Sequence, residues 1–250
     1  AAPAPGSMLL AGIMLKMGVY GMIRWLVPIC PDALQQYAPA LMTLAVAGIV
    51  YASVIAIRQD DLKRLVAYSS IAHVGLIAAG VFALTPHAME GAVIQMVSHG
   101  VNIVGLFILI DLIELRTGTR SIAGLGGIAL KAPRLAAFFM IILLGSVALP
   151  LTNGFVGEFL LLLGIFEYSA IGAAIAGLTI IFSAVYMLWM YQRVMFGTTN
   201  GITESITDLS VMEMAALVPL VVMVFWIGLF PGLFLNVAYP DVLQILNFTN

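Results

Sequence analysis

The stretch from residue 135 to residue 168 reads LAAFFMIILLGSVALPLTNGFVGEFLLLLGIFEY. It is apolar over about 34 residues, or roughly 50 Å as a straight helix, which is too long for one ordinary membrane span and too short for two. Pro150 and Gly154 bracket a polar interruption in its middle. Because proline removes a backbone donor and glycine is permissive, the stretch predicts a broken helix. Such a break is tolerated at membrane depth only inside protein or beside a wet cavity, and it is common at transporter ion sites.

The composition supports a membrane location. Hydrophobic residues make up 62% and charged residues 9% of the 250 positions, whereas soluble chains carry about 25% charge. A single cysteine, Cys30, excludes an internal disulfide framework and any CxxC metal or redox motif. No basic cluster suggests a nucleic-acid partner. The first residues, AAPAPGS, lack the basic start of a signal peptide, and we expect them to lie inside a longer protein.

Apolar runs of about 20 residues predict six further spans. The seven predicted spans, including the broken one, cover residues 8–27, 38–57, 65–84, 91–112, 135–168, 171–195 and 212–230. We therefore expect an all-α integral membrane bundle over residues 1–230. The tail over residues 231–250 is mixed in character, and its VAYPDVLQILNF segment is a candidate short surface helix.

The cationic residues indicate an orientation. If all seven spans cross once, eight of these residues fall on one side: Arg58, Lys63, Arg64, Arg116, Arg120, Lys131, Arg134 and Arg193. The opposite side keeps only Arg24. The positive-inside rule then predicts that the basic side is cytoplasmic and that the chain starts there and ends outside. A fifth segment that crossed twice would move Arg193 to the other side.

Ionisable residues inside the predicted spans are the candidate functional residues. Each costs about 2.5–3.5 kcal/mol at the centre of a span on insertion scales, so its presence favours a function. Four positions qualify, namely Lys16, His73, His99 and Glu158. Burial and neighbours can tune lysine and histidine to titrate near neutral pH. Basic groups that alternate with a carboxylate and are joined by water form a proton relay, which we expect these four residues to carry.

Uncharged polar residues accompany these four. Gln95, His99 and Asn102 follow one another at i, i+4 and i+7, which places them on one face of a helix. Two serines precede His73 in the same span. Two further polar residues lie at the predicted break, where they add hydrogen-bond donors and acceptors near Glu158. These further supporting residues are Ser69, Ser70, Thr152 and Asn153.

Plainer interpretations exist for each position. Lys16 could snorkel to the surface, and Glu158 could cap a half-helix that begins near Gly154. A lone membrane histidine often serves packing or a hydrogen bond between helices. The depths of His73 and His99, counted from opposite ends of their helices, differ by roughly 8 Å. That offset argues against a shared haem iron in an electron-transfer bundle, which is one alternative function; a purely structural bundle is another.

Four segments carry a resemblance to a known family. They are AAPAPGSMLLAGIMLKMGVYG (1–21), QDDLKRLVAYSSIAHVG (59–75), GAVIQMVSHGVNIVGLFIL (91–109) and LPLTNGFVGEF (149–159). In this order they resemble the antiporter-like subunits of respiratory complex I, the proton-translocating NADH:quinone oxidoreductase. The resemblance covers essentially the whole chain, but only the C-terminal half of such a subunit.

The resemblance implies one half of an inverted-repeat, antiporter-like fold in which each half contains one broken helix. Lys16 matches the family's central connecting lysine between two half-channels, and His73 and His99 match histidines of the central polar axis. Glu158 matches the terminal acidic residue of the M-type subunits, whereas related antiporter-like subunits usually have a lysine there. The first half-channel uses a glutamate and a lysine on spans that precede Ala1.

The resemblance also implies a function and its setting. The chain would be a non-redox, proton-pumping part of a translocase in the bacterial cytoplasmic (inner) membrane. Its partners would be the lipid bilayer and other membrane-arm subunits of complex I, including neighbouring antiporter-like subunits. NADH, flavin, iron–sulfur clusters and quinone would bind to partner subunits, so we expect no cofactor and no metal in this chain. The alternative of the same ancestry is a subunit of a cation/proton antiporter or of a membrane-bound hydrogenase.

Overall fold

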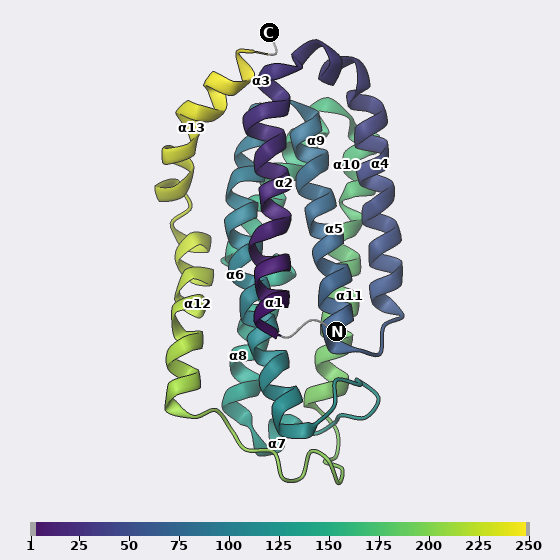
Figure 1. Cartoon of the computed structure of the whole chain (residues 1–250), viewed down its shortest axis with the longest axis vertical. Coiled ribbons are helices and arrows are strands. Elements are labelled where there is room, and N and C mark those ends of the chain that lie inside the picture. The colour runs from purple at the N-terminus through teal and green to yellow at the C-terminus, as the bar shows by residue number, and fades with distance from the viewer. Residues whose placement is uncertain (1–3, 249–250) are drawn as a thin grey trace.

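The computed structural model describes residues 4–248, and its helices run along one long axis (Figure 1). The helical elements, in chain order, are α1 (Ala4–Leu9), η1 (Leu10–Met14), α2 (Leu15–Gly21), η2 (Met22–Leu26), α3 (Val27–Ile29), α4 (Pro31–Ile57), α5 (Leu62–Ala83), α6 (Pro86–Thr117), α7 (Ile128–Lys131), α8 (Pro133–Ser146), α9 (Asn153–Tyr168), α10 (Ala170–Ala176), α11 (Leu178–Met195), α12 (Val211–Leu229) and α13 (Gly232–Leu246). The elements η1 and η2 are π-helical turns within the first long helix. The predicted all-α fold is confirmed.

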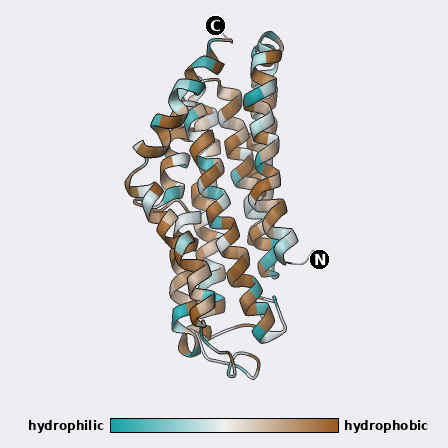
Figure 2. Cartoon of the chain, turned by 60° about the vertical axis from the view of Figure 1, so that its left-hand side comes forward, coloured by the Kyte–Doolittle hydropathy of each residue, from teal (hydrophilic) through white to brown (hydrophobic). Residues whose placement is uncertain are grey.

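The membrane prediction is also confirmed. Within residues 4–248, six helices are long and apolar enough to cross a bilayer, and apolar residues extend along most of their length (Figure 2). A seventh crossing is made by α8 and α9 in succession (Figure 1). With 14 and 16 residues, these two helices are roughly 21 and 24 Å long, so neither alone spans a hydrocarbon core of about 30 Å.

The broken helix lies where the sequence predicts it. Between α8 and α9, Ala148 and Leu151 have φ angles of 57° and 76°, a left-handed conformation that is costly for residues other than glycine. The chain then turns back so tightly that a methyl group on Gly154 would overlap the carbonyl oxygen of Gly145. Glycine is therefore required at residue 154 for the two half-helices to meet.

The predicted basic loops meet at one end of the bundle, which is the lower end in Figure 1. Arg120 lies 3.2 Å from Asp61, and Arg193 lies 4.0 Å from Asp60. Because Arg193 follows the sixth span, its position beside the loop before α5 means that the fifth segment crosses once. The assignment of this end to the cytoplasm stays a prediction.

Several helices extend beyond the predicted apolar spans. Helix α6 covers residues 86–117 rather than 91–112. The side chain of Thr85 accepts a hydrogen bond from the backbone N–H of Ala88 at 3.3 Å, and Gly118 ends the helix with a φ angle of 69°. Such capping residues fix the ends of a helix, whereas hydropathy detects only its apolar middle.

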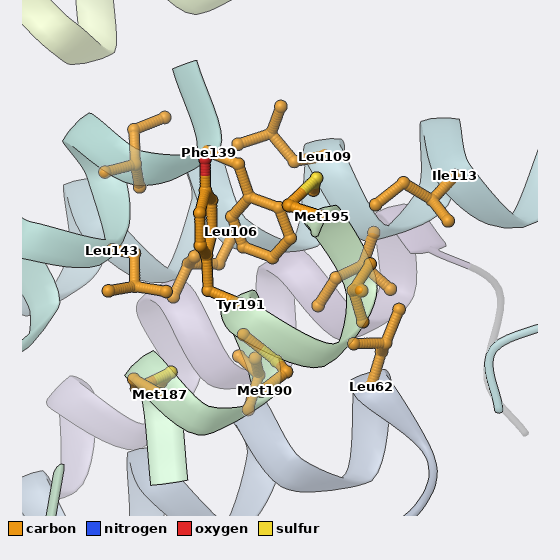
Figure 3. Packing of buried hydrophobic residues seen from close by; sticks show 14 of the residues in the cluster. Leu62, Leu106, Leu109, Ile113, Phe139, Leu143, Met187, Met190, Tyr191 and Met195 are labelled. Atoms are coloured by element: carbon orange, nitrogen blue, oxygen red, sulfur yellow. The ribbon is translucent and has the colours of Figure 1, made fainter. Parts of the chain in front are cut away.

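A hydrophobic core fills the half of the bundle nearest the basic loops. Figure 3 shows its packing from close by. Its aromatic centre is an edge-to-face pair of Phe139 and Tyr191, with ring centroids 5.9 Å apart. The hydroxyl of Tyr191 donates to the carbonyl oxygen of Ala136 at 3.0 Å, so the polar atom of this buried ring is satisfied. The core holds α6, α8 and α11 together below the broken helix.

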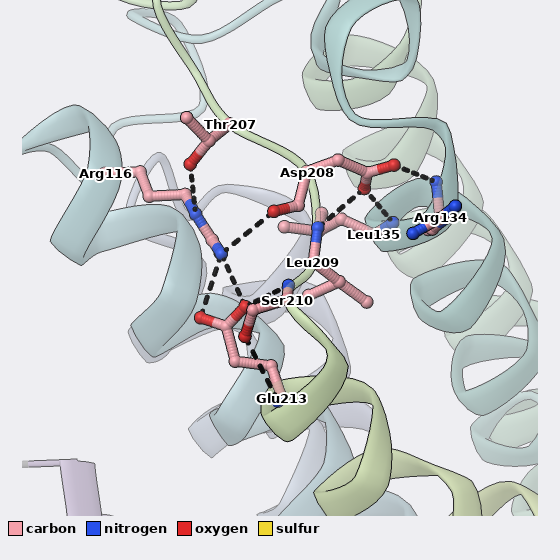
Figure 4. Close-up of polar contacts among 8 residues, drawn as sticks. All are labelled: Arg116, Arg134, Leu135, Thr207, Asp208, Leu209, Ser210 and Glu213. Atoms are coloured by element: carbon pink, nitrogen blue, oxygen red, sulfur yellow. Dashed lines mark hydrogen bonds and ion pairs between the residues drawn. The ribbon is translucent and has the colours of Figure 1, made fainter.

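The lower end of α8 is capped from a distance. Its N-cap residue, Ala132, has no side chain that can accept a hydrogen bond. Instead, the carboxylate of Asp208, in the loop before α12, accepts from the backbone N–H groups of Arg134 and Leu135 at 3.2 and 3.0 Å (Figure 4). These N–H groups have no partner within the helix, so the carboxylate replaces the missing cap.

The same loop is tied to the end of α6. Arg116 forms an ion pair of 2.7 Å with Glu213, and the carboxylate of Glu213 also accepts from the backbone N–H of Ser210 in a capping box that begins α12 (Figure 4). This loop and the first turn of α12 therefore link the lower ends of α6, α8 and α12 to one another.

We expect Asp208→Ala to destabilise the protein by about 1 kcal/mol at neutral pH, the typical cost of a lost cap. Burial opposes ionisation of Asp208, but the backbone N–H groups that it accepts from hold its pKa below the usual value of 3.8. Since the pKa is lower in the folded state, the stabilisation is present above pH 3.8 and disappears as the pH falls through the lower folded value. Thermal unfolding of the full-length protein in detergent, measured against pH, tests this.

The control for this prediction is Glu204→Ala, which removes an exposed carboxylate from the same loop. It should leave the melting temperature unchanged. If Asp208→Ala did not lower the melting temperature, or lowered it equally at every pH, the proposed cap would be contradicted.

Candidate functional site

All four predicted ionisable residues lie inside the bundle. The exposed fractions are 8% for Lys16, 1% for His73, 2% for His99 and 1% for Glu158. The ammonium group of Lys16 donates to the carbonyl oxygen of Ala11, one π-helical turn earlier. Lys16 therefore does not snorkel to the surface.

The closest contact in the site joins α5 to α9. Nδ1 of His73 lies 3.0 Å from Oε1 of Glu158, and Nε2 of Gln95, on α6, donates to the same oxygen at 3.3 Å. Helix α9 begins at Asn153, and its first turn contains no acidic residue. The alternative in which Glu158 caps this half-helix is therefore wrong, because its carboxylate contacts side chains of two other helices.

The two histidines contact each other directly. The ring centroids of His73 and His99 lie 5.2 Å apart, with the rings tilted by 41°. This contact is closer than the depth difference of roughly 8 Å expected from helix counting. The counts began at residues 65 and 91, whereas α5 begins at Leu62 and α6 at Pro86, so the counted depths were wrong. A haem shared by the two rings would have to separate them.

Lys16 approaches this group from the first long helix. Helix α6 packs closely there, since a methyl carbon on Gly100 would lie 3.3 Å from the carbonyl oxygen of Gly12. Gly12 precedes Lys16 by about one helical turn, and Gly100 directly follows His99, so this close approach brings the helix segments that carry Lys16 and His99 together. The π-helical elements η1 and η2 lie on either side of Lys16, and such turns often occur at functional sites. In space the order is therefore Lys16, His99, His73 and Glu158, which we call the relay line.

Small residues let α6 and α9 approach closely enough to form this contact. A methyl group on Gly157 would overlap the side chain of Gln95, and one on Gly164 would overlap Ala88. Glycine at residue 157 thus makes the space in which Gln95 reaches the carboxylate of Glu158.

The predicted supporting residues do not all lie beside the four ionisable residues. Ser70 is buried beside the relay line, and its hydroxyl has no hydrogen-bond partner within residues 4–248. Asn102 and Asn153 are buried near the break, where Nδ2 of Asn153 donates to the carbonyl oxygen of Ser98 at 3.1 Å. The hydroxyl of Thr152 donates to the carbonyl oxygen of Leu149 at 2.6 Å. Thr152 therefore stabilises the turn.

Tyr186, a buried polar residue of α11, was not predicted. The hydroxyl of Tyr186 donates to Oγ of Ser69 at 3.2 Å, and Ser69 is on α5, the helix that carries His73. A signal exists in the sequence, because Thr179, Ser183 and Tyr186 follow one another at i, i+4 and i+7 in an otherwise apolar helix.

The chemistry available to this arrangement is proton transfer. Lysine, histidine and glutamate each bind one exchangeable proton, and the imidazole ring presents two nitrogens at which it can accept and release one. Within residues 4–248 no group of three or more His, Cys, Asp or Glu residues is placed to hold a metal ion.

Comparison with known proteins identifies the family. Residues 1–184 match the family described as "NADH:quinone oxidoreductase/Mrp antiporter, TM". The chain belongs to this family. NADH-quinone oxidoreductase subunit M of Rickettsia conorii is 47% identical over 246 residues, which are 98% of this chain and 50% of that protein. The chain is therefore a homologue of subunit M and spans about half the length of the curated relatives it matches.

Solved structures agree with this family assignment. A chain of respiratory complex I from Thermus thermophilus with bound NADH is 34% identical with a TM-score of 0.89, over 94% of this chain and 50% of that one. A chain of the Mrp complex from Dietzia sp. has a TM-score of 0.84 at 18% identity, over 97% of this chain and 55% of that one. At that identity the likeness shows the fold alone. The antiporter-like fold of the subunit M homologue is thereby confirmed.

Proposed function

We propose that this subunit M homologue translocates protons in the membrane arm of an NADH:quinone oxidoreductase. Protons would move along the relay line of Lys16, His99, His73 and Glu158. The observation that carries the proposal is the 3.0 Å contact between His73 and Glu158, two ionisable side chains that are each 1% exposed. Ionisable pairs inside membrane spans are costly and usually serve ion or proton pathways.

The geometry couples the charge states of neighbouring groups. A proton on the imidazole of His73 stabilises the carboxylate of Glu158, and the hydrogen bond from Gln95 favours the same charged form. Protonating Glu158 removes this attraction and favours release of the proton from His73. At the other end, a charged Lys16 disfavours a charged His99. Each proton transfer therefore alters the affinity of the next site for a proton, which is the requirement for directed transfer along a line.

The names of the relatives suggest the setting. We infer that the full-length protein assembles with other membrane-arm subunits, including neighbouring antiporter-like ones, in a bacterial cytoplasmic membrane. Quinone reduction elsewhere in the complex would supply the energy. The reactions of NADH, flavin, iron–sulfur clusters and quinone would take place in partner subunits, so this chain acts as a non-redox part of the translocase.

A cation/proton antiporter subunit is the second candidate, because the matched family includes Mrp antiporters. Affinity purification of the full-length protein from its native membrane distinguishes the two candidate functions. Our proposal predicts that NADH-oxidising subunits co-purify with it and that NADH oxidation acidifies one side of reconstituted vesicles without sodium. Isolation with antiporter subunits alone, or proton movement that requires sodium exchange, would overturn the proposal.

A further inference from the structure

A cavity of about 500 Å³ lies between the first long helix, α6 and α13, toward the upper end of the bundle in Figure 1. Sites that bind small molecules commonly measure about 300–1,000 Å³. Two charged side chains line the cavity, Arg24 on η2 and Asp241 on α13. Neither belongs to the relay line, so the cavity is a separate feature of the bundle.

The two charges of this cavity are not paired with each other or with other side chains. Among residues 4–248, neither Arg24 nor Asp241 forms an ion pair. An unpaired charge beside the hydrocarbon of a bilayer is costly. Each of the two side chains therefore favours a partner of opposite charge from outside the described chain.

The aromatic residues near Arg24 indicate its depth in the membrane. Tyr20, which also lines the cavity, and Trp25 pair edge to face with ring centroids 6.3 Å apart. Both rings are exposed on the surface of the bundle. Tyrosine and tryptophan are enriched at the membrane–water interface, where lipid headgroups lie. The charged cavity is therefore at the depth of the headgroups.

A smaller hollow of about 160 Å³ adjoins the charged cavity, since Val93 and Ala238 line both. The other residues that line this hollow are all apolar: Ile94, Val97, Ile227, Phe234, Leu235 and Val237. Helix α13 rises to the upper end of the bundle (Figure 1). It lines the apolar hollow with residues 234–238 and the charged cavity with residues 238–245. The charged surface thus lies toward the membrane surface, and the apolar surface lies toward the membrane interior.

We propose that the charged cavity binds the headgroup of phosphatidylethanolamine, a zwitterionic phospholipid, with an acyl chain along the apolar hollow. The guanidinium of Arg24 binds the phosphate, and the carboxylate of Asp241 accepts hydrogen bonds from the ammonium group. An anionic phospholipid without an amine places a further negative charge beside Asp241, and a choline headgroup has no N–H group to donate. The two charges therefore select the ethanolamine headgroup. This site does not depend on the proposed proton transfer.

Density maps of the complex that contains the full-length protein test the occupant. The complex is placed in nanodiscs of phosphatidylethanolamine, phosphatidylcholine or phosphatidylglycerol. The expected result is a headgroup within about 2.7–3.2 Å of both Arg24 and Asp241 in the first lipid and no ordered headgroup there in the other two. Equal density in all three lipids would overturn the proposal. A cavity filled by side chains from the rest of the protein or from a neighbouring subunit would overturn it as well.

Photo-cross-linking measures the affinity of the site. Phosphatidylethanolamine with a photoactivatable acyl chain is titrated onto the complex in detergent, and its adducts with α13 are quantified by mass spectrometry. We expect Arg24→Gln to raise the half-maximal lipid concentration about tenfold, because one charge-assisted hydrogen bond is lost. Arg24→Lys, which keeps the charge, should raise it less. Asp241→Asn should bind photoactivatable phosphatidylglycerol as tightly as phosphatidylethanolamine, since a neutral amide does not repel an anionic lipid.

The control is Asp32→Asn, which removes an exposed carboxylate from the first turn of α4, away from the cavity. It should leave both the half-maximal concentration and the lipid preference unchanged. An unchanged half-maximal concentration for Arg24→Gln, or an unchanged lipid preference for Asp241→Asn, would overturn the proposal. Neither result bears on proton transfer, which Glu158→Gln tests separately.

Discussion

Glu158→Gln in the full-length protein is expected to abolish proton transfer through this subunit while the complex still assembles. Glutamine has nearly the same shape and can still accept the hydrogen bond from Gln95, but it cannot carry a proton. Loss of a group that transfers protons typically slows the step by about 10²–10⁴-fold. The reconstituted complex should therefore lose this subunit's share of the protons pumped per NADH.

The matched control for this prediction is Glu167→Gln, on the same helix. Glu167 lies 2.7 Å from His87 in a pair of which both members are more than a third exposed. Exposed ion pairs contribute little to stability, and this one lies away from the relay line. Its replacement should leave pumping unchanged. Wild-type pumping by an assembled Glu158→Gln complex would refute the role of the carboxylate.

Lys16→Ala is expected to have an effect of similar size. Among residues 4–29, Lys16 is the ionisable residue that lies buried inside the bundle. Its removal therefore takes away the proton-binding neighbour that the first long helix offers to His99. Lys16→Arg gives the sharper test. Arginine keeps the positive charge but does not release its proton in proteins, so it should also block transfer by about 10²–10⁴-fold.

Exposed Lys131, on α7, supplies the control for charge removal. Lys131→Met should leave the protons pumped per NADH unchanged. If the assembled Lys16→Arg complex pumped normally, Lys16 would act only as a fixed charge, and the relay would not require it to release a proton.

The fold could be predicted in large part because its signals are local. The break between α8 and α9 was evident from Pro150 and Gly154 within an apolar run that is too long for one span. The single crossing of the fifth segment required the structure, because it depends on the contact between Arg193 and Asp60 at the basic end. The hydropathy pattern also predicted an α6 that is shorter than the observed helix, because the capping residue Thr85 contributes no apolar character.

The candidate site could be predicted only as a set of residues. Four costly side chains in apolar spans were visible, but their distances depend on how far each helix is shifted against its neighbours. Counting along helices therefore separated His73 from His99. In the structure, Gly157 lets α9 pack closely against α6 beside Gln95, and Glu158 then contacts Gln95 and His73. Tyr186 was missed because one hydroxyl on an apolar aromatic residue weighs little in a pattern.

Proton pumping by the Lys16→Ala, Glu158→Gln and double variants, compared in the reconstituted complex, tests the central claim most directly. If both residues belong to one relay line, either change blocks the whole line. Each single variant and the double variant should then lose the same share of the protons pumped per NADH. A double variant that loses the sum of two separate shares would show that Lys16 and Glu158 serve different pathways and would contradict a single relay line.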